Sequence, residues 1–277
     1  MLHSLAIEFP SISPIALRLG HLEIRWYGLA YAVGLVAAWA YVRSMLSTSR
    51  LWLTRQKPFP DDLAIDMLLY SAIGVFVGGR LGDVLLYEPG YYWHNLQEIP
   101  AVWHGGMAFH GAVIGTGLAL VLLARRRHLP ALTLIDLCTA AAPIGLFPGR
   151  LANFLNAELW GHVSMVPWAM VFPGAGPQPR HPSQLYEALT EGLLLFLLLR
   201  YAIYARSLLG RPGMVTGLFL VGYAIARILC EFFREDTDPQ IGLGFLTSGQ
   251  MYSLPMVLVG TGIFAWARHR RSDALAG

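Results

Sequence analysis

Three residues with helical spacing could form an anion site near the end of an apolar stretch. Tyr223, Arg227 and Glu231 follow one another at intervals of four residues, so on a helix they share one face. A guanidinium is planar, always charged and able to hold a phosphate through two hydrogen bonds. We therefore expect Arg227 to face an anion while Glu231 orients it. The alternative is a structural Arg227–Glu231 ion pair that locks two helices together.

Other ionisable residues lie in or beside apolar stretches. Placing an ionisable side chain inside a membrane costs free energy, so each of them indicates a structural or functional role. Arg150 supplies a second cation, and Arg80 and His110 occur in two further stretches. We expect Arg150 and Arg227 to converge on an anionic lipid headgroup, with Arg80 as another substrate-binding candidate. His110 is either a proton acceptor or a hydrogen-bonded core histidine.

A non-helical stretch at about 148–182 is expected to fold back over this site, because long loops in compact proteins are usually functional or disordered. Within it, the amide of Asn153 can hydrogen-bond a glycerol or phosphate oxygen. Glu158 belongs either to the site or to an ion pair that holds Arg150 or Arg180 in place.

Glycines in two of the apolar stretches have two interpretations. Gly78, Gly82 and the pair Gly105-Gly106 could bind phosphate through exposed N–H groups. Small residues in membrane spans more often allow two helices to approach closely. We therefore expect helix packing at Gly78 and Gly82.

The composition indicates what kind of protein positions these residues. The chain has 277 residues, of which 55% are hydrophobic and only 13% charged, and its mean hydropathy is +0.50. Soluble domains carry about 25% charged residues, so a disordered chain, a coiled coil and an ordinary cytosolic enzyme are excluded. Basic residues form short clusters rather than one face, which argues against nucleic acid as a partner. An all-α, multi-pass membrane protein is the expected fold class.

Seven apolar stretches are long enough to cross about 30 Å of hydrocarbon. They lie at about 26–46, 63–87, 105–124, 131–149, 183–204, 213–233 and 249–267. Thirteen of the 20 Lys and Arg residues follow the first, third, fifth and seventh stretches. Because cytoplasmic loops carry an excess of Lys and Arg, the N-terminus is expected outside and the C-terminus in the cytoplasm. We expect one integral membrane domain over 1–277.

This orientation gives several polar residues a common depth. Counting 1.5 Å per helical residue, Tyr27, Arg80, His110, Arg150 and Arg227 all fall in the outer half of the membrane. Scattered structural pairs would not share one depth. The pattern therefore predicts a site near the outer leaflet.

Six segments, spread over the whole chain, resemble one enzyme family. They are RWYGLAY at 25–31, GVFVGGRLGDVLLY at 74–87, WHGGMAFHGAVIG at 103–115, GRLANFLNAELWG at 149–161, HPSQLYEALTEG at 181–192 and GYAIARILCEFFRE at 222–235. The chain resembles the prolipoprotein diacylglyceryl transferases. The resemblance implies seven transmembrane helices in a bacterial cytoplasmic membrane. It also implies transfer of diacylglycerol from phosphatidylglycerol to the lipobox cysteine of a preprolipoprotein, with release of glycerol 1-phosphate.

The resemblance also assigns roles to matching positions. Arg150 and Arg227 match the essential arginines of the family, Arg150 as a ligand of phosphatidylglycerol, and His110 matches a histidine proposed as base. Four further residues match positions important for activity in the family: Tyr27, Asn153, Glu158 and Gly161. Tyr223 and Glu231 match the companions of the second arginine.

The expected chemistry needs neither a cofactor nor a metal, since the sequence has no Walker motif and no metal-ligand cluster. A cysteine thiolate is the nucleophile, and charge builds on the leaving phosphate, where Arg150 and Arg227 can stabilise it. His110 or the phosphate itself accepts the thiol proton. The competing hypotheses are an outward-facing transporter or binding protein for an anionic solute or lipid, and a membrane scaffold held by ion pairs.

Overall fold

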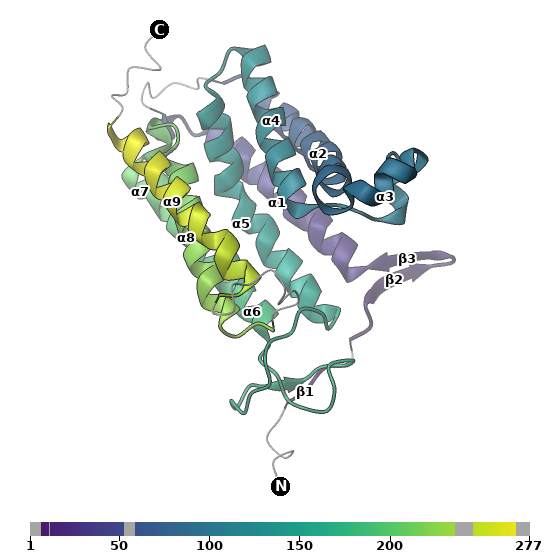
Figure 1. Ribbon diagram of the computed structural model, residues 1–277. Coiled ribbons are helices and arrows are strands. Elements are labelled where there is room, and N and C mark those ends of the chain that lie inside the picture. Colours follow the sequence, from purple (N-terminus) through teal and green to yellow (C-terminus); the bar gives the residue numbers. More distant parts are fainter. Residues whose placement is uncertain (1–6, 11, 53–58, 236–245, 270–277) are drawn as a thin grey trace. The chain divides into compact units, whose positions relative to one another are not determined.

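The computed structural model describes residues 7–10, 12–52, 59–235 and 246–269. The chain divides into two compact units, and Figure 1 labels their helices and strands. The first unit comprises residues 1–41 and 139–277, and the second comprises residues 42–138.

Within the described residues, six helical segments are long and apolar enough to cross a membrane. They are α1 (Trp26–Ser47), α2 with the π-helical turn η2 (Leu63–Gly82 and Asp83–Tyr87), α4 (Phe109–Arg127), α5 (Ala131–Leu155), the segment of α6, π-helical η5 and α7 (Ser183–Glu187, Ala188–Leu194 and Leu195–Arg206), and α8 (Met214–Glu231). The expectation of an all-α, multi-pass membrane protein is confirmed, as are six of the seven expected spans.

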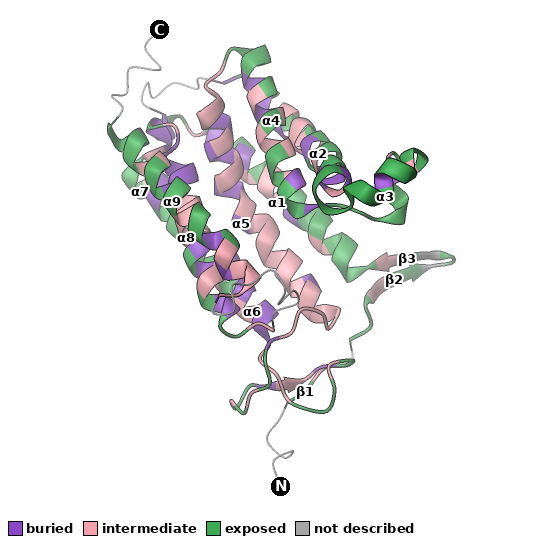
Figure 2. Ribbon diagram, in the orientation of Figure 1, coloured by how far each residue is buried: buried purple, intermediate pink, exposed green. Residues whose placement is uncertain are grey.

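The seventh expected span is the helix α9 (Ser248–His269), which is 22 residues long but not among these six. Polar Gln250 and Ser253 lie in its first two turns, and Pro255 follows, which lowers its hydropathy. Apolar side chains such as Leu258 are nonetheless exposed on its surface, as they are on the other long helices (Figure 2). Exposed apolar faces of this kind are what a helix presents to lipid.

Short elements connect the long helices. Strand β1 (Ile7–Glu8) pairs in parallel with β4 (Met170–Val171), and β2 (Ile15–Leu19) forms an antiparallel hairpin with β3 (Leu22–Arg25). The remaining elements are short helices: η1 (Ser49–Leu51), α3 (Pro89–His94), η3 (Leu96–Glu98), η4 (Val102–His104) and η6 (Leu208–Gly210).

Helices α2 and α4 of the second unit pack through glycines. A Cβ atom on Gly78 would lie 2.4 Å from the carbonyl oxygen of Gly111, and one on Gly82 would lie 2.7 Å from the Gly111 Cα. Gly74 and Gly115 face each other in the same way. The helices can approach this closely only because no side chain intervenes, so the expected packing role of Gly78 and Gly82 is confirmed.

Two expected boundaries are wrong. Helix α5 continues to Leu155, so the non-helical stretch begins near residue 156 rather than 148. Pro148 removes one backbone donor, but its ring packs against α1, where a Cβ on Gly34 would be 3.2 Å from Pro148 Cγ. Helix α4 begins at Phe109 rather than at 105, because Gly105 and Gly106 adopt φ values of 93° and 76° that a right-handed helix excludes.

Candidate active site

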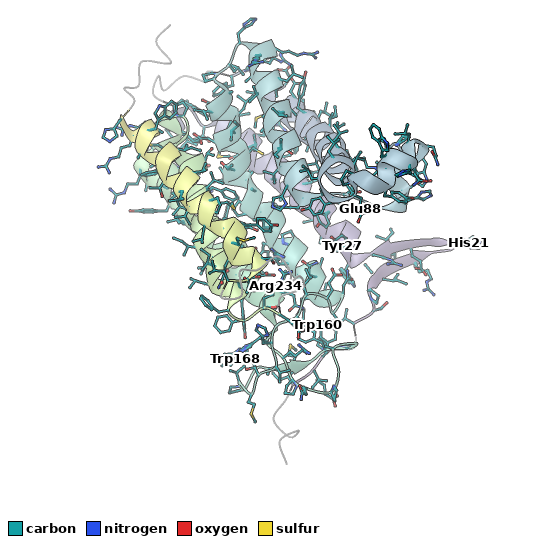
Figure 3. All side chains as sticks on the ribbon, viewed as in Figure 1. His21, Tyr27, Glu88, Trp160, Trp168 and Arg234 are labelled. Atoms are coloured by element: carbon teal, nitrogen blue, oxygen red, sulfur yellow. The ribbon has the colours of Figure 1, made fainter. Side chains whose placement is uncertain are left out.

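Three arginines and three glutamates meet inside the first unit. Arg150 comes from α5, Arg227 from α8, and Arg234 follows the end of α8. Arg234 is labelled in Figure 3. The carboxylates are Glu187 at the end of α6, Glu191 in η5, and Glu231 at the end of α8.

Arg150 is held by the two glutamates of the α6–η5 segment. Its Nε and Nη2 atoms both donate to Oε2 of Glu191, at 3.2 and 2.9 Å. Its Nη1 atom lies 3.3 Å from Oε2 of Glu187. One edge of the guanidinium is therefore occupied by a single carboxylate oxygen.

Glu187 joins all three arginines. Its Oε1 atom accepts a short hydrogen bond from Arg227 and one of 3.0 Å from Arg234, in addition to the Arg150 contact. Arg227 also lies 2.9 Å from Glu231 and 3.7 Å from Glu191. The expected Arg227–Glu231 pair is thus present, but it forms part of a larger cluster.

The cluster is almost entirely removed from solvent. The side chains of Glu187 and Glu191 are 0% exposed, and that of Arg150 is 16% exposed. In such surroundings charges interact strongly and an unpaired charge is costly. Three positive and three negative groups balance among the described residues, and the arginine edges can present donors to an anion.

Backbone features give the glutamates their positions. Glu191 lies in the π-helical segment η5, and π-helical turns occur frequently at functional sites. Gly249 at the start of α9 leaves space for Glu231, since a Cβ there would lie 2.5 Å from the carboxylate carbon.

Asn153 and Glu158 lie beside this cluster and contact each other. Asn153 Nδ2 donates to Oε1 of Glu158 at 2.7 Å. Tyr27 and Tyr223 are within electrostatic range of Arg150, and Tyr27 is also within range of Glu158. The structure therefore brings these four predicted residues around Arg150.

The alternative interpretation of Glu158, an ion pair that holds Arg150 or Arg180 in place, is not borne out among the described residues. Arg150 is held by glutamates of the α6–η5 segment, and Arg180 Nη1 donates to Glu235 at 2.7 Å. The hydrogen bond from Arg180 holds the pKa of Glu235 below its usual range.

Burial, together with nearby His162, lowers the pKa of His181, which favours its neutral form at pH 7.

Gly161 has a packing role in this region. A Cβ on it would lie 2.1 Å from the carbonyl oxygen of Phe233 and 2.8 Å from His181 Cβ. Its backbone pairs with that of Arg234, while its carbonyl oxygen accepts a hydrogen bond from Arg180. These contacts place Gly161 directly beside the backbone of Arg234.

His110 and Arg80 belong to the second unit. His110 lies in the first turn of α4, where its Nδ1 atom is 2.9 Å from the hydroxyl of Tyr87 in η2. Arg80 is enclosed by main chain: its nitrogens donate to the carbonyl oxygens of Ile99, Gly105, Gly106, Glu98 and Ala101. Those five bonds use all five donors of the guanidinium, so the geometry gives Arg80 a structural role.

Glu187, Glu191 and Arg234 are functional candidates that sequence reasoning missed. The signal was present, because Glu187 and Glu191 are four residues apart within an apolar span. Only the fold shows that both carboxylates reach Arg150 and Arg227.

Comparison with known proteins identifies the family. The family model described as prolipoprotein diacylglyceryl transferase matches residues 14–266. The chain belongs to this family. It is 52% identical over 270 residues to the phosphatidylglycerol–prolipoprotein diacylglyceryl transferase of Methylocella silvestris, covering 96% of this chain and 97% of that protein. It is 47% identical to the Brucella canis enzyme of the same name over 279 residues, covering 100% of this chain and 98% of that protein.

Membership confirms the resemblance carried by the six motifs and, with it, the expected transferase activity. The transporter and scaffold hypotheses are not needed to explain the buried charges. This family member is a multi-pass membrane protein with bacterial relatives.

Proposed function

We propose that this transferase moves the diacylglyceryl group of phosphatidylglycerol to the lipobox cysteine of a prolipoprotein, and that the arginine cluster holds the lipid phosphate. The observation that carries the proposal is the convergence of Arg150 and Arg227 on shared, fully buried carboxylates. A phosphate is recognised by the same guanidinium edges that bind a carboxylate. Tyr27, Asn153, Glu158 and Tyr223 lie around Arg150 and would contact the headgroup.

The reaction is a displacement at carbon. The cysteine sulfur forms a bond to the terminal glyceryl carbon as that carbon loses its bond to the phosphate oxygen. The products are a thioether and glycerol 1-phosphate. Negative charge grows on the departing phosphate, where positive charge from Arg150 and Arg227 lowers the barrier.

The thiol must lose its proton for sulfur to attack. His110 is the proposed acceptor, and Tyr87 fixes its ring through the 2.9 Å contact with Nδ1. His110→Gln should nearly abolish turnover while phosphatidylglycerol still binds, and substantial residual turnover would remove His110 from this role.

The proposed setting is the bacterial cytoplasmic membrane, with α9 as a seventh span, the N-terminus outside and the C-terminus in the cytoplasm. Lys and Arg at the ends of alternate spans support this orientation. It places the site toward the outer leaflet, beneath the loop before α6, where a secreted substrate arrives. The chain then acts as one integral membrane domain.

The experiment is a transfer assay with the purified protein in detergent, phosphatidylglycerol and a lipobox peptide, followed by peptide mass. The peptide should gain one diacylglyceryl group, and a peptide with serine in place of cysteine should not. Arg150→Ala should lower the rate by at least about 100-fold, the scale of losing a transition-state donor. Arg18→Ala is the control, since Arg18 is an exposed residue of the β2–β3 hairpin. Equal rates for the two variants would refute the role of Arg150.

A further inference from the structure

We propose that Glu191 is the carboxylate that yields to the lipid phosphate: it releases Arg150 and takes up a proton when phosphatidylglycerol binds. This inference rests on the proposed function, because it assumes that the phosphate binds at Arg150.

The first argument is that Glu191 occupies the place of the ligand. Its Oε2 atom accepts from both Nε and Nη2 of Arg150, at 3.2 and 2.9 Å. This is one of the guanidinium edges that can hold an oxyanion through two parallel hydrogen bonds. A phosphate can use that edge only after the carboxylate has left it.

The second argument compares the three glutamates. Glu187 contacts all three arginines, and Glu231 is 2.9 Å from Arg227. Glu191 depends on Arg150, because its Oε1 atom is 3.7 Å from Arg227 and makes no hydrogen bond to a described residue. Displacing Glu191 therefore breaks hydrogen bonds to Arg150 alone, whereas displacing Glu187 would also break its bonds to Arg227 and Arg234. Its place in the π-helical η5 is consistent with a functional position.

The third argument is charge balance. The cluster of three arginines and three glutamates is neutral among the described residues, and a phosphodiester adds one negative charge. A net charge in a buried site is costly, and one proton on the displaced carboxylate restores neutrality. The charged and titratable groups that face Glu191 are Arg150 from α5, Arg227, Tyr223 and Cys230 from α8, and Glu187 on its own segment.

The test measures proton uptake during lipid binding, without peptide and therefore without turnover. Short-chain phosphatidylglycerol is titrated into the detergent-solubilised protein in buffers of different ionisation enthalpy. We expect about one proton per bound lipid near pH 7, and affinity that falls by up to about tenfold per pH unit as the pH rises. Diacylglycerol, which lacks phosphate, should cause no uptake.

Glu191→Gln replaces the protonated carboxyl by a neutral amide of the same shape. This variant should bind phosphatidylglycerol with no proton uptake and with an affinity that is flat across the same pH range. Glu235→Gln is the matched control, because Glu235 pairs with Arg180 outside the cluster and stays ionised at pH 7. Its proton uptake should equal that of the unmodified protein.

Three results would overturn the inference. If the unmodified protein binds phosphatidylglycerol without proton uptake, the cluster accepts the phosphate without protonation of Glu191. This result would overturn the inference whatever Glu191→Gln does. Uptake that persists in Glu191→Gln would assign the proton to another group, and uptake with diacylglycerol would remove the phosphate from the argument. The transfer assay on the same preparation separates these results from a failure of the proposed function, in which no diacylglyceryl group reaches the peptide.

Discussion

At the scale of single residues, an arginine can bind a ligand only with donors that the fold leaves available or can release. Every N–H donor of the Arg80 guanidinium binds a main-chain carbonyl oxygen between residues 98 and 106. Its Cζ atom also lies 5.0 Å from the centroid of the Tyr92 ring. Arg150 is instead held by carboxylates, which are anions of the kind its guanidinium would exchange for phosphate. Arginine therefore stabilises a loop in the second unit, whereas in the first unit it is the proposed ligand of the lipid phosphate.

Arg80→Lys tests the structural role. Lysine has three donors in place of five, so at least two carbonyl oxygens around the guanidinium lose a charged partner. We expect the free energy of unfolding to fall by about 2–3 kcal/mol, which thermal unfolding in detergent would measure. Arg125→Lys, at an exposed position of α4, should change it by less than about 0.5 kcal/mol. Equal stability of the two variants would contradict the role given to Arg80.

Residue types alone predicted part of this site. Arg150 and Arg227 could be inferred because an arginine inside an apolar span needs an anionic partner. Which carboxylates supply that partner could not be inferred, because Glu187 and Glu191 reach α5 and α8 only through tertiary packing. The alternative pairing of Glu158 with Arg150 or Arg180 is not observed, because the fold brings glutamates from more distant segments to both arginines.

At the scale of elements, close helix contacts determine where the charged groups lie. Helix α9 approaches α8 along glycines: a Cβ on Gly217 would lie 2.7 Å from the backbone nitrogen of Phe264, and one on Gly260 would lie 2.8 Å from Leu220 Cβ. At its first turn, Gly249 lies against the carboxylate of Glu231. Helix α9 therefore helps to keep Glu231 on Arg227.

Gly249→Ala tests this contact. The added methyl group would meet the Glu231 carboxylate carbon at 2.5 Å and push it from Arg227. We expect transfer activity to fall by at least about tenfold, the cost of roughly 1.4 kcal/mol in the barrier. Gly262→Ala is the matched control on the same helix, because a methyl group at Gly262 would meet no neighbouring atom within 4 Å. Unchanged activity in both variants would show that Glu231 does not depend on α9.

The loop before α6 is tied to the end of α8 by the Arg180–Glu235 pair, which Trp160 joins through Nε1 at 3.1 Å. Because the folded-state pKa of Glu235 is lowered, the pair stabilises the fold above the ordinary glutamate pKa and loses this effect as pH falls. With the Glu235 side chain 45% exposed, we expect Glu235→Gln to cost only about 0.5–1 kcal/mol at pH 7. Thermal unfolding should show this difference shrinking below about pH 4.3, and a constant difference would contradict the assignment.

Element types were predictable because apolar stretches of about 20 residues leave few alternatives to helix. Element ends were less predictable, and the reasons are local. The hydropathy pattern extends α4 back to residue 105. Gly105 and Gly106 have positive φ values, however, so they lie outside the helix. Pro148 does not end α5, because packing against α1 outweighs the loss of one hydrogen bond.

At the scale of the whole molecule, the number of spans decides on which side of the membrane each terminus lies. Helix α9 is 22 residues long, or about 33 Å at 1.5 Å per residue, which is sufficient to cross the hydrocarbon. With α9 as a span, a reporter fused after Gly277 should be cytoplasmic and one fused before Met1 should be outside. Reporters on the same side would leave six spans and contradict the proposed orientation.

The central claim is that the phosphate of phosphatidylglycerol binds at Arg150 and Arg227. An experimental structure of the protein with bound phosphatidylglycerol tests it most directly. Phosphate oxygens should lie within hydrogen-bonding distance, about 2.7–3.2 Å, of guanidinium nitrogens of both arginines. A phosphate bound elsewhere, with the Arg150 and Arg227 ion pairs to Glu187 and Glu191 intact, would contradict the account.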